Sequence, residues 1–316
     1  MTEARADSRP APGAERRRYF AVVIAALALW TLLPGKGDSA APPAMAEPAA
    51  ARPAVLIGAG DIADCGVDED EETAQILDRQ PGTVFTVGDN VYESGTVEEF
   101  AECYHPTWGR HKHRTMPAVG NHEYLTDGAR PYFEYFGAAA GNPWKGYYSY
   151  NRGGWHIVVL NSNCSEVGGC DWGSRQVNWL RRDLINNPRP CTIAYWHSPR
   201  FTSGERGNRA DMIPFWQVLY RHRVDVVLNG HDHFYERFRP QTPWGQLARF
   251  RGITQFTVGT GGKGLSEIPN VASNSVVRED ETHGVLKLSL LNGAFRWRFI
   301  PIDGQSFADS GRTACR

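Results

Sequence analysis

Several short apolar runs of the sequence end in side chains that can bind metal ions. An acid, an amide or a histidine follows each of these runs, usually after a glycine, and the set is Asp61, Asp89, Asn121, His122, His197, His231 and His233. Asp, Asn and Gly all favour turns, but histidine does not, so turn chemistry alone does not explain the pattern. Active sites of α/β folds collect at the carboxyl ends of strands.

The chemistry of this set follows from its oxygen and imidazole nitrogen atoms, which suit two hard or borderline metal ions. Two metal ions about 3.5–4 Å apart activate water and clamp a phosphoryl group during in-line displacement. Tyr92 follows Asp89 by three residues and, taken alone, would only pack or cap the loop. The residues by themselves therefore predict a two-metal hydrolase that acts on a phosphate ester.

The elements that must position these residues are short apolar runs alternating with amphipathic ones. Enrichment in Val, Ile and aromatic residues, with Gly, Asn or Asp at the ends, predicts strands at 54–59, 83–87, 116–119, 147–150, 156–161, 192–196, 224–228, 253–258, 285–291 and 295–301. Periodicity and end signals predict helices over 70–79, 174–186 and 210–221, with Ser174 as the cap of the second. The order of these elements predicts an α/β protein built on large mixed sheets in one domain.

Length and charge limit the function further. The chain of 316 residues is enough for one large domain or two small ones. Its formal net charge of −1 gives no sign of a surface that binds polyanions. We therefore expect a small phosphate ester as substrate and no nucleic-acid polymer as partner, although a nucleotide substrate is compatible with this charge.

The N-terminal residues have the layout of an export signal. A basic flank with Arg16-Arg17-Arg18 precedes an apolar run over 19–33, which is short for a membrane span, and a Pro/Ala-rich stretch with an A-x-A site follows. We expect an export signal over 1–46 with cleavage after Ala46, a short linker over 47–52 and a catalytic domain over 53–316. The predicted localisation is secreted, and the alternative is a chain anchored in the membrane by 19–33.

The cysteine pattern fits an exported protein. None of the six cysteines forms a C-x-x-C pair, which disfavours a zinc or redox motif. An even number of cysteines behind an export signal favours disulfides, with buried thiols as the alternative. The expected bonds are Cys164–Cys170, Cys65–Cys103 and Cys191–Cys315.

The ordered motifs resemble those of the calcineurin-like metallophosphoesterases, and in particular the purple acid phosphatase-like branch. They are Gly60-Asp61, Gly88-Asp89-x-x-Tyr92, Gly120-Asn121-His122-Glu123, His197, Gly230-His231-x-His233-x-Tyr-Glu-Arg237 and Gly259-Thr260-Gly261-Gly262. The resemblance implies a four-layer α/β/β/α sandwich with two mixed β-sheets and the metals at one sheet edge. The sequence departs from the family in the first motif, where Asp61-Ile62-Ala63 lacks the usual glycine. Asp64 is expected to cap a turn, and the alternative is that it replaces the lost loop contact.

The resemblance also implies a ligand set for each of two metal ions. The first ion is implied to bind Asp61, Asp89, Tyr92 and His233. The second is implied to bind Asp89, Asn121, His197 and His231, so Asp89 would bridge the two ions. Ionising a tyrosine phenol of pKa about 10 calls for a strong Lewis acid such as Fe(III). The neutral ligands of the other site suit a divalent ion, which could be Zn, Fe or Mn.

The remaining site residues concern the substrate. By resemblance, His122 lies near the leaving group as a phosphate hydrogen-bond donor or general acid, and an orienting role is the alternative. Larger relatives carry phosphate-binding histidines downstream of His197, and this chain has none there. Arg200 or Arg206 could grip the phosphate instead, or could be solvated surface charges.

These residues and the resemblance predict a secreted, metal-dependent phosphoric ester hydrolase of purple acid phosphatase type. It is expected to hydrolyse phosphate monoesters through attack by a metal-bound hydroxide. One alternative is a phosphodiesterase or nucleotidase on the same metal centre, since the metal motifs do not separate these activities. Another is a non-catalytic secreted protein that binds phosphate esters at a relict site.

Overall fold

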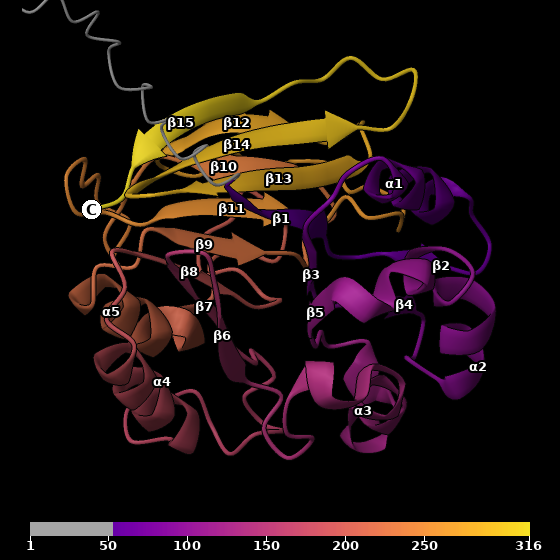
Figure 1. Ribbon diagram of the computed structural model, residues 1–316, viewed down its shortest axis with the longest axis horizontal. Helices are drawn as coiled ribbons and strands as arrows, with labels where there is room; N and C mark the ends of the chain where they lie inside the picture. Colours follow the sequence, from indigo (N-terminus) through magenta and orange to yellow (C-terminus); the bar gives the residue numbers. More distant parts are fainter. Residues whose placement is uncertain (1–52) are drawn as a thin grey trace, which may run out of the picture. The chain divides into compact units, whose positions relative to one another are not determined.

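A computed structural model of the chain describes residues 53–316. The expected export signal and linker, with their cleavage site and apolar run, lie outside these described residues. Within them, two stacked β-sheets form the centre, helices α4 and α5 cover one sheet, and helices α1, α2 and α3 lie beside the other (Figure 1). This is the α/β fold with two mixed sheets that the sequence predicts.

The first sheet carries three parallel strands at one side and three antiparallel strands at the other. Its order is β15-β14-β13-β1-β3-β5, where β1, β3 and β5 run parallel. Its strands are β1 (Ala54–Ala59), β3 (Thr83–Val87), β5 (Thr115–Ala118), β13 (Gly284–Leu291), β14 (Ala294–Pro301) and β15 (Ser310–Ala314). Because β1, β3 and β5 are parallel, their carboxyl ends meet at one edge.

The second sheet has the order β12-β10-β11-β9-β8-β7-β6, and β7, β8, β9 and β11 run parallel within it. Its strands are β6 (Tyr148–Arg152), β7 (Trp155–Val159), β8 (Cys191–Tyr195), β9 (Val226–Asn229), β10 (Tyr235–Phe238), β11 (Thr254–Val258) and β12 (Ser275–Glu279). A separate short pair, β2 (Ala63–Asp64) and β4 (Val91–Tyr92), joins the loops that follow β1 and β3.

Aromatic side chains fill the space between the two sheets. Phe85 of β3 lies against Tyr195 of β8, with ring centroids 5.9 Å apart, and Phe295 of β14 lies 6.0 Å from Trp155 of β7. All four rings are buried. The exposed Arg296 and Arg298 alternate with the inward residues of β14, so period-two alternation in β14 places its apolar residues against the second sheet.

The α-helices bury apolar side chains, except for the three-residue α2, which has no buried residue. They are α1 (Glu69–Asp78), α2 (Val97–Glu99), α3 (Arg130–Phe136), α4 (Arg175–Asn186) and α5 (Ile213–Arg221). Ser174 caps α4 as predicted, because its side chain accepts a hydrogen bond from the Val177 amide. The predicted helix over 210–221 is a 3₁₀ turn, Ala210–Met212, followed by α5.

All three predicted disulfides are present, and no cysteine of the described residues is free. They join Cys65 to Cys103, Cys164 to Cys170, and Cys191 to Cys315. The last bond fastens the C-terminal end of the chain, just after β15, to the start of β8. Three disulfides indicate folding in an oxidising, extracellular or secretory compartment.

Every predicted strand is present, with ends shifted by a few residues, but several elements were not predicted. The missed strands and α-helices are β2, β4, β10, β12, β15, α2 and α3, and several short 3₁₀ and π helices were missed as well. Helix α3 contains an aromatic cluster whose Tyr132, Phe133 and Phe136 are buried. These rings belong mainly to the core, and Phe133 also borders a cavity described below.

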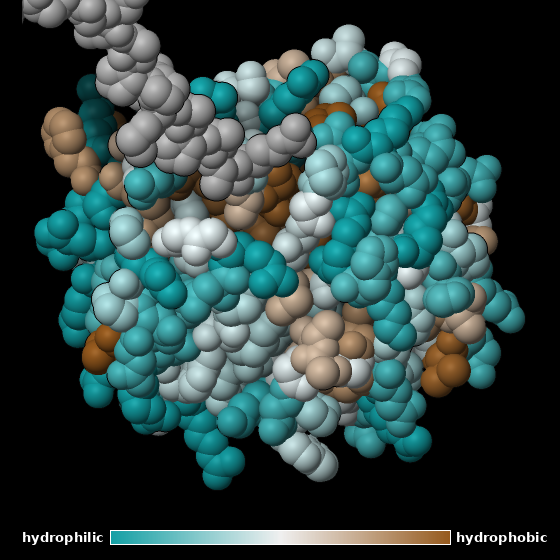
Figure 2. All heavy atoms as spheres, in the orientation of Figure 1, coloured by the Kyte–Doolittle hydropathy of each residue, from teal (hydrophilic) through white to brown (hydrophobic). Residues whose placement is uncertain are grey.

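Ten large apolar side chains of the described part are exposed, and three of them, Trp244, Leu247 and Phe250, lie in one short segment. The face in Figure 2 is largely hydrophilic, with small apolar areas. Among the more exposed side chains are Val97, Leu125 and Trp144. None of the helices within residues 53–316 has both the length and the apolar character needed to span a membrane.

Asp70, in the first turn of α1, gives a prediction about stability and pH. Burial raises its pKa from the ordinary 3.8 to about 6, although Thr107 Oγ1 donates a hydrogen bond of 2.7 Å to its carboxylate. The folded protein therefore binds this proton more tightly than the unfolded chain, so stability falls as pH rises from about 4 through about 6. Asparagine does not titrate, so the Asp70→Asn variant should not lose this stability. Relative to the wild type, we expect its unfolding free energy to be about 2 kcal/mol more favourable at pH 7.5 than at pH 4.

Urea unfolding of the wild type and the Asp70→Asn variant at pH 4 and pH 7.5 checks this expectation. The two proteins share all other titrating groups, so the difference between their unfolding free energies isolates Asp70. The difference should favour the variant more at pH 7.5 than at pH 4. An equal difference at both pH values would contradict the effect of burial on this carboxyl group.

Candidate metal centre

The predicted metal ligands lie together at the carboxyl ends of parallel strands from both sheets. Asp61 follows β1, Asp89 follows β3, and Asn121 follows β5 in the first sheet. His197 follows β8, and His231 and His233 follow β9, in the second sheet. The edge where the two sheets meet thus collects residues separated by up to 172 positions, between Asp61 and His233.

The backbone at these strand ends takes conformations that side chains other than glycine rarely adopt. Asp61, Asp89 and His231 have φ values of 58°, 48° and 72°. Such left-handed residues cost free energy and cluster at functional sites. Position 120 requires glycine, because a Cβ there would lie 2.1 Å from the Asp89 carboxylate. These strained turns direct the carboxylates into the space between the strand ends.

One group of ligand atoms converges around the Tyr92 hydroxyl. Tyr92 Oη lies 2.9 Å from Asp61 Oδ1, 3.3 Å from Asp89 Oδ2 and 3.2 Å from His233 Nε2. His233 Nε2 is also 3.4 Å from Asp61 Oδ1. Two carboxylates, one phenol and one imidazole therefore present four atoms to a common point.

A second group converges around His197 Nε2. This atom lies 3.0 Å from Asp89 Oδ2, 3.1 Å from Asn121 Oδ1 and 3.1 Å from His231 Nδ1. Asp89, His197 and His231 offer ligand atoms that all lie within 4.8 Å of one another. Asp89 Oδ2 approaches both Tyr92 and His197, so the two groups share this oxygen. The geometry brings together all seven residues that the sequence predicts as ligands.

Hydrogen bonds on the outer side of the centre orient two of the imidazole rings. His197 Nδ1 donates to the Val87 carbonyl at 2.9 Å, and His233 Nδ1 donates to the Gly264 carbonyl at 2.9 Å. The proton on Nδ1 leaves the Nε2 lone pair of each ring directed at the centre. Metal-binding histidines typically have this arrangement. The donor set therefore fits two cations.

The buried acidic groups of the centre also favour bound cations. Asp61, Asp89, Tyr92 and His197 are almost completely buried. Among the described residues, the ion-pair partners of the two carboxylates are all histidines. Burial raises the pKa of the Tyr92 phenol well above its usual value, and Asp61 and Asp89 raise it further. Such a phenol ionises only beside a strong positive charge.

The electrostatic balance between Asp89 and His197 is consistent with this picture. Burial opposes ionisation of Asp89, yet the neighbouring His197 keeps the pKa of Asp89 well below its usual range. Burial acts to lower the pKa of His197, but the Asp89 carboxylate raises it to about 9. Asp89 is therefore an ionised, buried carboxylate at the point that the two ligand groups share.

His122 lies at the rim and outside both ligand groups. Its backbone amide donates to Asp89 Oδ1 at 2.9 Å, while its ring Nε2 is 3.9 Å from Asp89 Oδ2. Ring Nδ1 donates to the Glu93 carbonyl at 2.6 Å. The ring is partly exposed, so it can face a substrate without binding a metal.

The structure separates the two arginines that the sequence predicts as phosphate contacts. Arg206 donates from its guanidinium to the backbone carbonyl of His231, and it lines a cavity of about 280 Å³ beside Asp232. Arg200 instead lies over the ring of Phe201, 4.5 Å from the ring centroid. Only Arg206 therefore contacts a residue of the ligand set.

Glu123 has a supporting role that sequence reasoning missed. This buried carboxylate accepts backbone hydrogen bonds from Asp89 at 3.2 Å, Asn90 at 2.5 Å and Gly120 at 2.6 Å. Burial and the nearby Asp89 charge raise its pKa to about 7. Glu123 thus ties the loop after β3 to the loop after β5. Its place directly after Asn121-His122 was the available signal.

Lys263 is a second residue without a predicted role. Its ammonium group lies 4.6 Å from the Tyr92 ring centroid and pairs with Asp64 at 2.9 Å and with Glu93. Asp64 also accepts a hydrogen bond from the Gly66 amide at 3.4 Å, which agrees with its predicted turn-capping role. Lys263 follows the Gly261-Gly262 pair, and this position was the only signal in the sequence.

Known proteins of similar structure share this fold. The structure of purple acid phosphatase PPD1 from yellow lupin (Lupinus luteus) seeds superposes with a TM-score of 0.63 at 19% identity, covering 83% of this chain and 53% of that one. GAP50, described as the anchor in the inner membrane complex of Plasmodium, gives a TM-score of 0.62 at 12% identity, covering 84% and 90%. At such identities the likeness establishes the fold alone.

Similar sequences point to one family. Purple acid phosphatase 15 of Arabidopsis thaliana is 27% identical over 201 residues, or 52% of this chain and 37% of the relative. Purple acid phosphatase 13 of the same plant is 34% identical over 131 residues, or 40% and 23%. The chain thus spans less than half of each of these relatives. Residues 38–235 match the calcineurin-like phosphoesterase model, and the chain belongs to this family of metal-dependent phosphoesterases.

Proposed function

We propose that the protein is a secreted phosphatase that hydrolyses phosphate monoesters at a two-metal centre of purple acid phosphatase type. The observation that carries this proposal is the position of Asp89 Oδ2, which is 3.3 Å from Tyr92 Oη and 3.0 Å from His197 Nε2. A carboxylate shared between a phenol-containing group and an imidazole-containing group is what a bridged pair of unlike metal ions requires.

The two groups of ligand atoms differ in charge, so they favour different ions. Asp61, Asp89, Tyr92 and His233 would hold the first ion, and a phenolate among them favours Fe(III). Asp89, Asn121, His197 and His231 would hold the second, and their mostly neutral donors favour a divalent ion such as Zn, Fe or Mn. When bound, the two ions supply Lewis-acid activation of water and neutralise charge on the phosphoryl group.

The protein's own residues would then position the ester and transfer protons. His122, partly exposed beside Asp89, would hydrogen-bond the phosphate or give a proton to the leaving oxygen. Arg206, which donates a hydrogen bond to the His231 carbonyl, would contact a phosphate oxygen at the rim. Glu123 would keep Asp89 and Asn121 in register by holding the two loops together.

Replacing Tyr92 by phenylalanine tests the phenolate ligand. The iron-loaded variant is expected to lose any visible charge-transfer band, because the Tyr92 oxygen would be absent from the first ligand group. The fold should persist, since the buried ring remains in place. The measurement is the visible absorption spectrum of the iron-loaded protein, with circular dichroism to monitor the fold.

Tyr104→Phe is the matched control for this test. Tyr104 is equally buried, and its hydroxyl has no hydrogen-bond partner within the described residues. This control should keep the spectrum of the wild type. If the Tyr92 variant also kept it, Tyr92 would not be a metal ligand.

A rate comparison tests the proposed activity. An aryl phosphate monoester and the matching diester would be offered across pH to metal-replete protein that begins at Glu47. We expect faster turnover of the monoester, and we expect Asp89→Ala to abolish it. Faster turnover of the diester would contradict the proposal in favour of a phosphodiesterase. Binding of both esters without metal-dependent turnover would instead support a binding protein.

A further inference from the structure

A second cavity has Tyr124, two residues after His122, in its lining and is not used by the proposed chemistry. Its volume is about 500 Å³. The apolar part of its lining consists of Tyr124, Phe133, Pro143 and Trp144. The charged part consists of Asp127, Arg130, Glu134 and Glu166. A lining that combines aromatic rings with several carboxylates favours organic cations as ligands.

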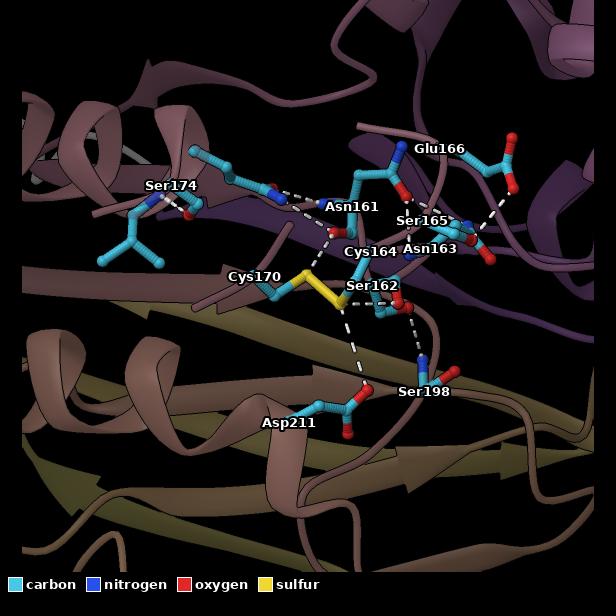
Figure 3. The surroundings of a disulfide bond; sticks show 12 residues. Asn161, Ser162, Asn163, Cys164, Ser165, Glu166, Cys170, Ser174, Ser198 and Asp211 are labelled. Carbon is cyan, nitrogen blue, oxygen red and sulfur yellow. Dashed lines mark hydrogen bonds between the residues drawn. A yellow bond between two sulfur atoms is a disulfide. The ribbon is translucent and has the colours of Figure 1, made fainter. Parts of the chain in front are cut away.

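Loops that line the cavity are connected to loops that carry candidate metal ligands. Tyr124 follows His122 by two residues, so their Cα atoms are at most about 7 Å apart. Asn163 Nδ2 donates to the Gly120 carbonyl at 3.1 Å, next to Asn121. The Ser198 amide, next to His197, donates to Ser162 Oγ at 3.0 Å. The loop that carries Glu166 is thus bound to the loops that carry Asn121 and His197, and Figure 3 shows the hydrogen bond between Ser162 and Ser198.

One buried residue holds the walls of the cavity together. Asn161 is completely buried, and its Nδ2 donates to the Tyr124 hydroxyl at 2.9 Å and to the Lys145 carbonyl at 3.3 Å. Its Oδ1 accepts a hydrogen bond from the Asn163 amide at 2.9 Å. The Cys164–Cys170 disulfide closes the loop that follows (Figure 3). The cavity is therefore preorganised by hydrogen bonds and a covalent bond.

The charges of the lining do not cancel. Glu134 pairs with Arg130 at 2.6 Å. Asp127 and Glu166 have no Lys or Arg partner among residues 53–316, and Glu166 only accepts a hydrogen bond from Ser165 Oγ at 2.9 Å. The excess negative charge disfavours an anionic group in the cavity. Trp144, which is 88% exposed, and the rings of Tyr124 and Phe133 offer faces that attract organic cations.

We propose that this cavity binds the alcohol part of a phosphate monoester that carries a quaternary or substituted ammonium group. The proposal rests on the phosphatase function proposed above. The phosphate would lie at the cationic metal centre, and the ammonium group would lie in the acidic, aromatic cavity. Hydrolysis then breaks the P–O bond to the alcohol, transfers the phosphoryl group to water, and places a proton on the leaving oxygen. The products are the amino alcohol and inorganic phosphate.

Two isosteric substrates isolate the effect of the positive charge. Phosphocholine and 3,3-dimethylbutyl phosphate differ in having nitrogen or carbon at the branched end, so their shapes are nearly the same. We expect kcat/KM for phosphocholine to exceed that for the neutral ester by at least about tenfold, because cation–π and carboxylate contacts act only on the former. Equal values would overturn the proposal.

Two substitutions test whether the preference for phosphocholine arises in this cavity. Trp144→Ala and Glu166→Gln should each lower, several-fold, the ratio of kcat/KM for phosphocholine to kcat/KM for the neutral ester. Trp244→Ala, at an exposed tryptophan outside the cavity, and Glu102→Gln, at an exposed glutamate, are the matched controls and should keep the preference. A preference retained in both cavity variants would overturn the assignment to this cavity.

A binding measurement separates this proposal from the phosphatase function. Saturation-transfer NMR with choline and 3,3-dimethylbutan-1-ol needs no turnover, and only choline should bind to the wild type, with loss in Trp144→Ala. Turnover of both esters without preference, together with no choline binding, would overturn the cavity proposal and leave the phosphatase. Choline binding without turnover of any ester would overturn the phosphatase and support the cavity as a cation site.

Discussion

Asp89→Asn is expected to remove both metal ions from the purified protein and to lower phosphate-ester turnover by at least about a thousandfold. The reason is that one oxygen of Asp89 approaches both Tyr92, at 3.3 Å, and His197, at 3.0 Å. Asparagine has the same shape but no charge, so neither ion keeps its bridging anion. Metal content by elemental mass spectrometry and turnover of an aryl phosphate measure the two effects.

Asp232→Asn is the matched control for this substitution. Asp232 is also buried and lies between the candidate ligands His231 and His233, but its Oδ2 has no hydrogen-bond partner within the described residues. The control should retain both ions and most of the turnover. Retention of two ions by Asp89→Asn would show that Asp89 is not the bridging ligand, and equal loss in the control would point to a general effect of charge.

Removal of the Cys191–Cys315 disulfide is expected to cost about 5 kcal/mol of unfolding free energy. The bond closes a separation of 124 residues, and the entropy of the unfolded chain rises with the length of the loop that is released. It also fastens the chain next to β15, where the Arg316 amide donates to Asp225 at 2.7 Å. The measurement is guanidinium unfolding of the Cys191→Ser, Cys315→Ser protein.

Removal of the Cys164–Cys170 disulfide by the same pair of substitutions is the matched control. This bond spans a separation of only 6 residues, so its removal should cost about 2 kcal/mol. The order of the two losses is the decisive result. If removal of the short-range bond cost as much or more, loop entropy would not explain how the long-range bond stabilises this fold.

The strands that the sequence predicts are those made mostly of apolar residues, because such residues are buried wherever the strand lies in the fold. Strands such as β3 and β8 are apolar runs, and both are buried. The missed strand β10 contains Glu236 and Arg237. In the sequence alone, such charged residues indicate a solvent-exposed segment and not a buried strand. In the fold, Glu236 accepts a hydrogen bond from the Ser203 amide at 3.0 Å, and Arg237 pairs with Asp309 at 2.6 Å. Their partners are remote in sequence, so no local pattern predicts them.

The edge strands β12 and β15 were missed for a related reason. Every residue of β12 is only partly buried, and β15 reads Ser-Gly-Arg-Thr-Ala, with little preference for a strand. Strand β15 is held by pairing with β14 and by the adjacent disulfide. Long-range pairing overrides weak local propensity in both strands, and a single sequence does not reveal such pairing.

The grouping of the candidate metal ligands was predictable because residue type and strand position together restrict them. Histidine, acid and amide side chains at several strand ends leave few alternative roles, and the motif order adds the tyrosine. The supporting residues were less predictable. Glu123 accepts hydrogen bonds from four backbone amides, and Asn161 donates to Tyr124 and Lys145, so their roles depend on contacts that only the fold creates.

The most direct test of the central claim is a metal titration of the metal-free protein. Iron and then zinc would be added in known equivalents, and turnover of an aryl phosphate monoester would be measured after each addition. The two-metal account predicts that turnover appears only as the second equivalent binds and that it reaches a plateau at two ions per chain. Full turnover with one ion or with none would contradict the account.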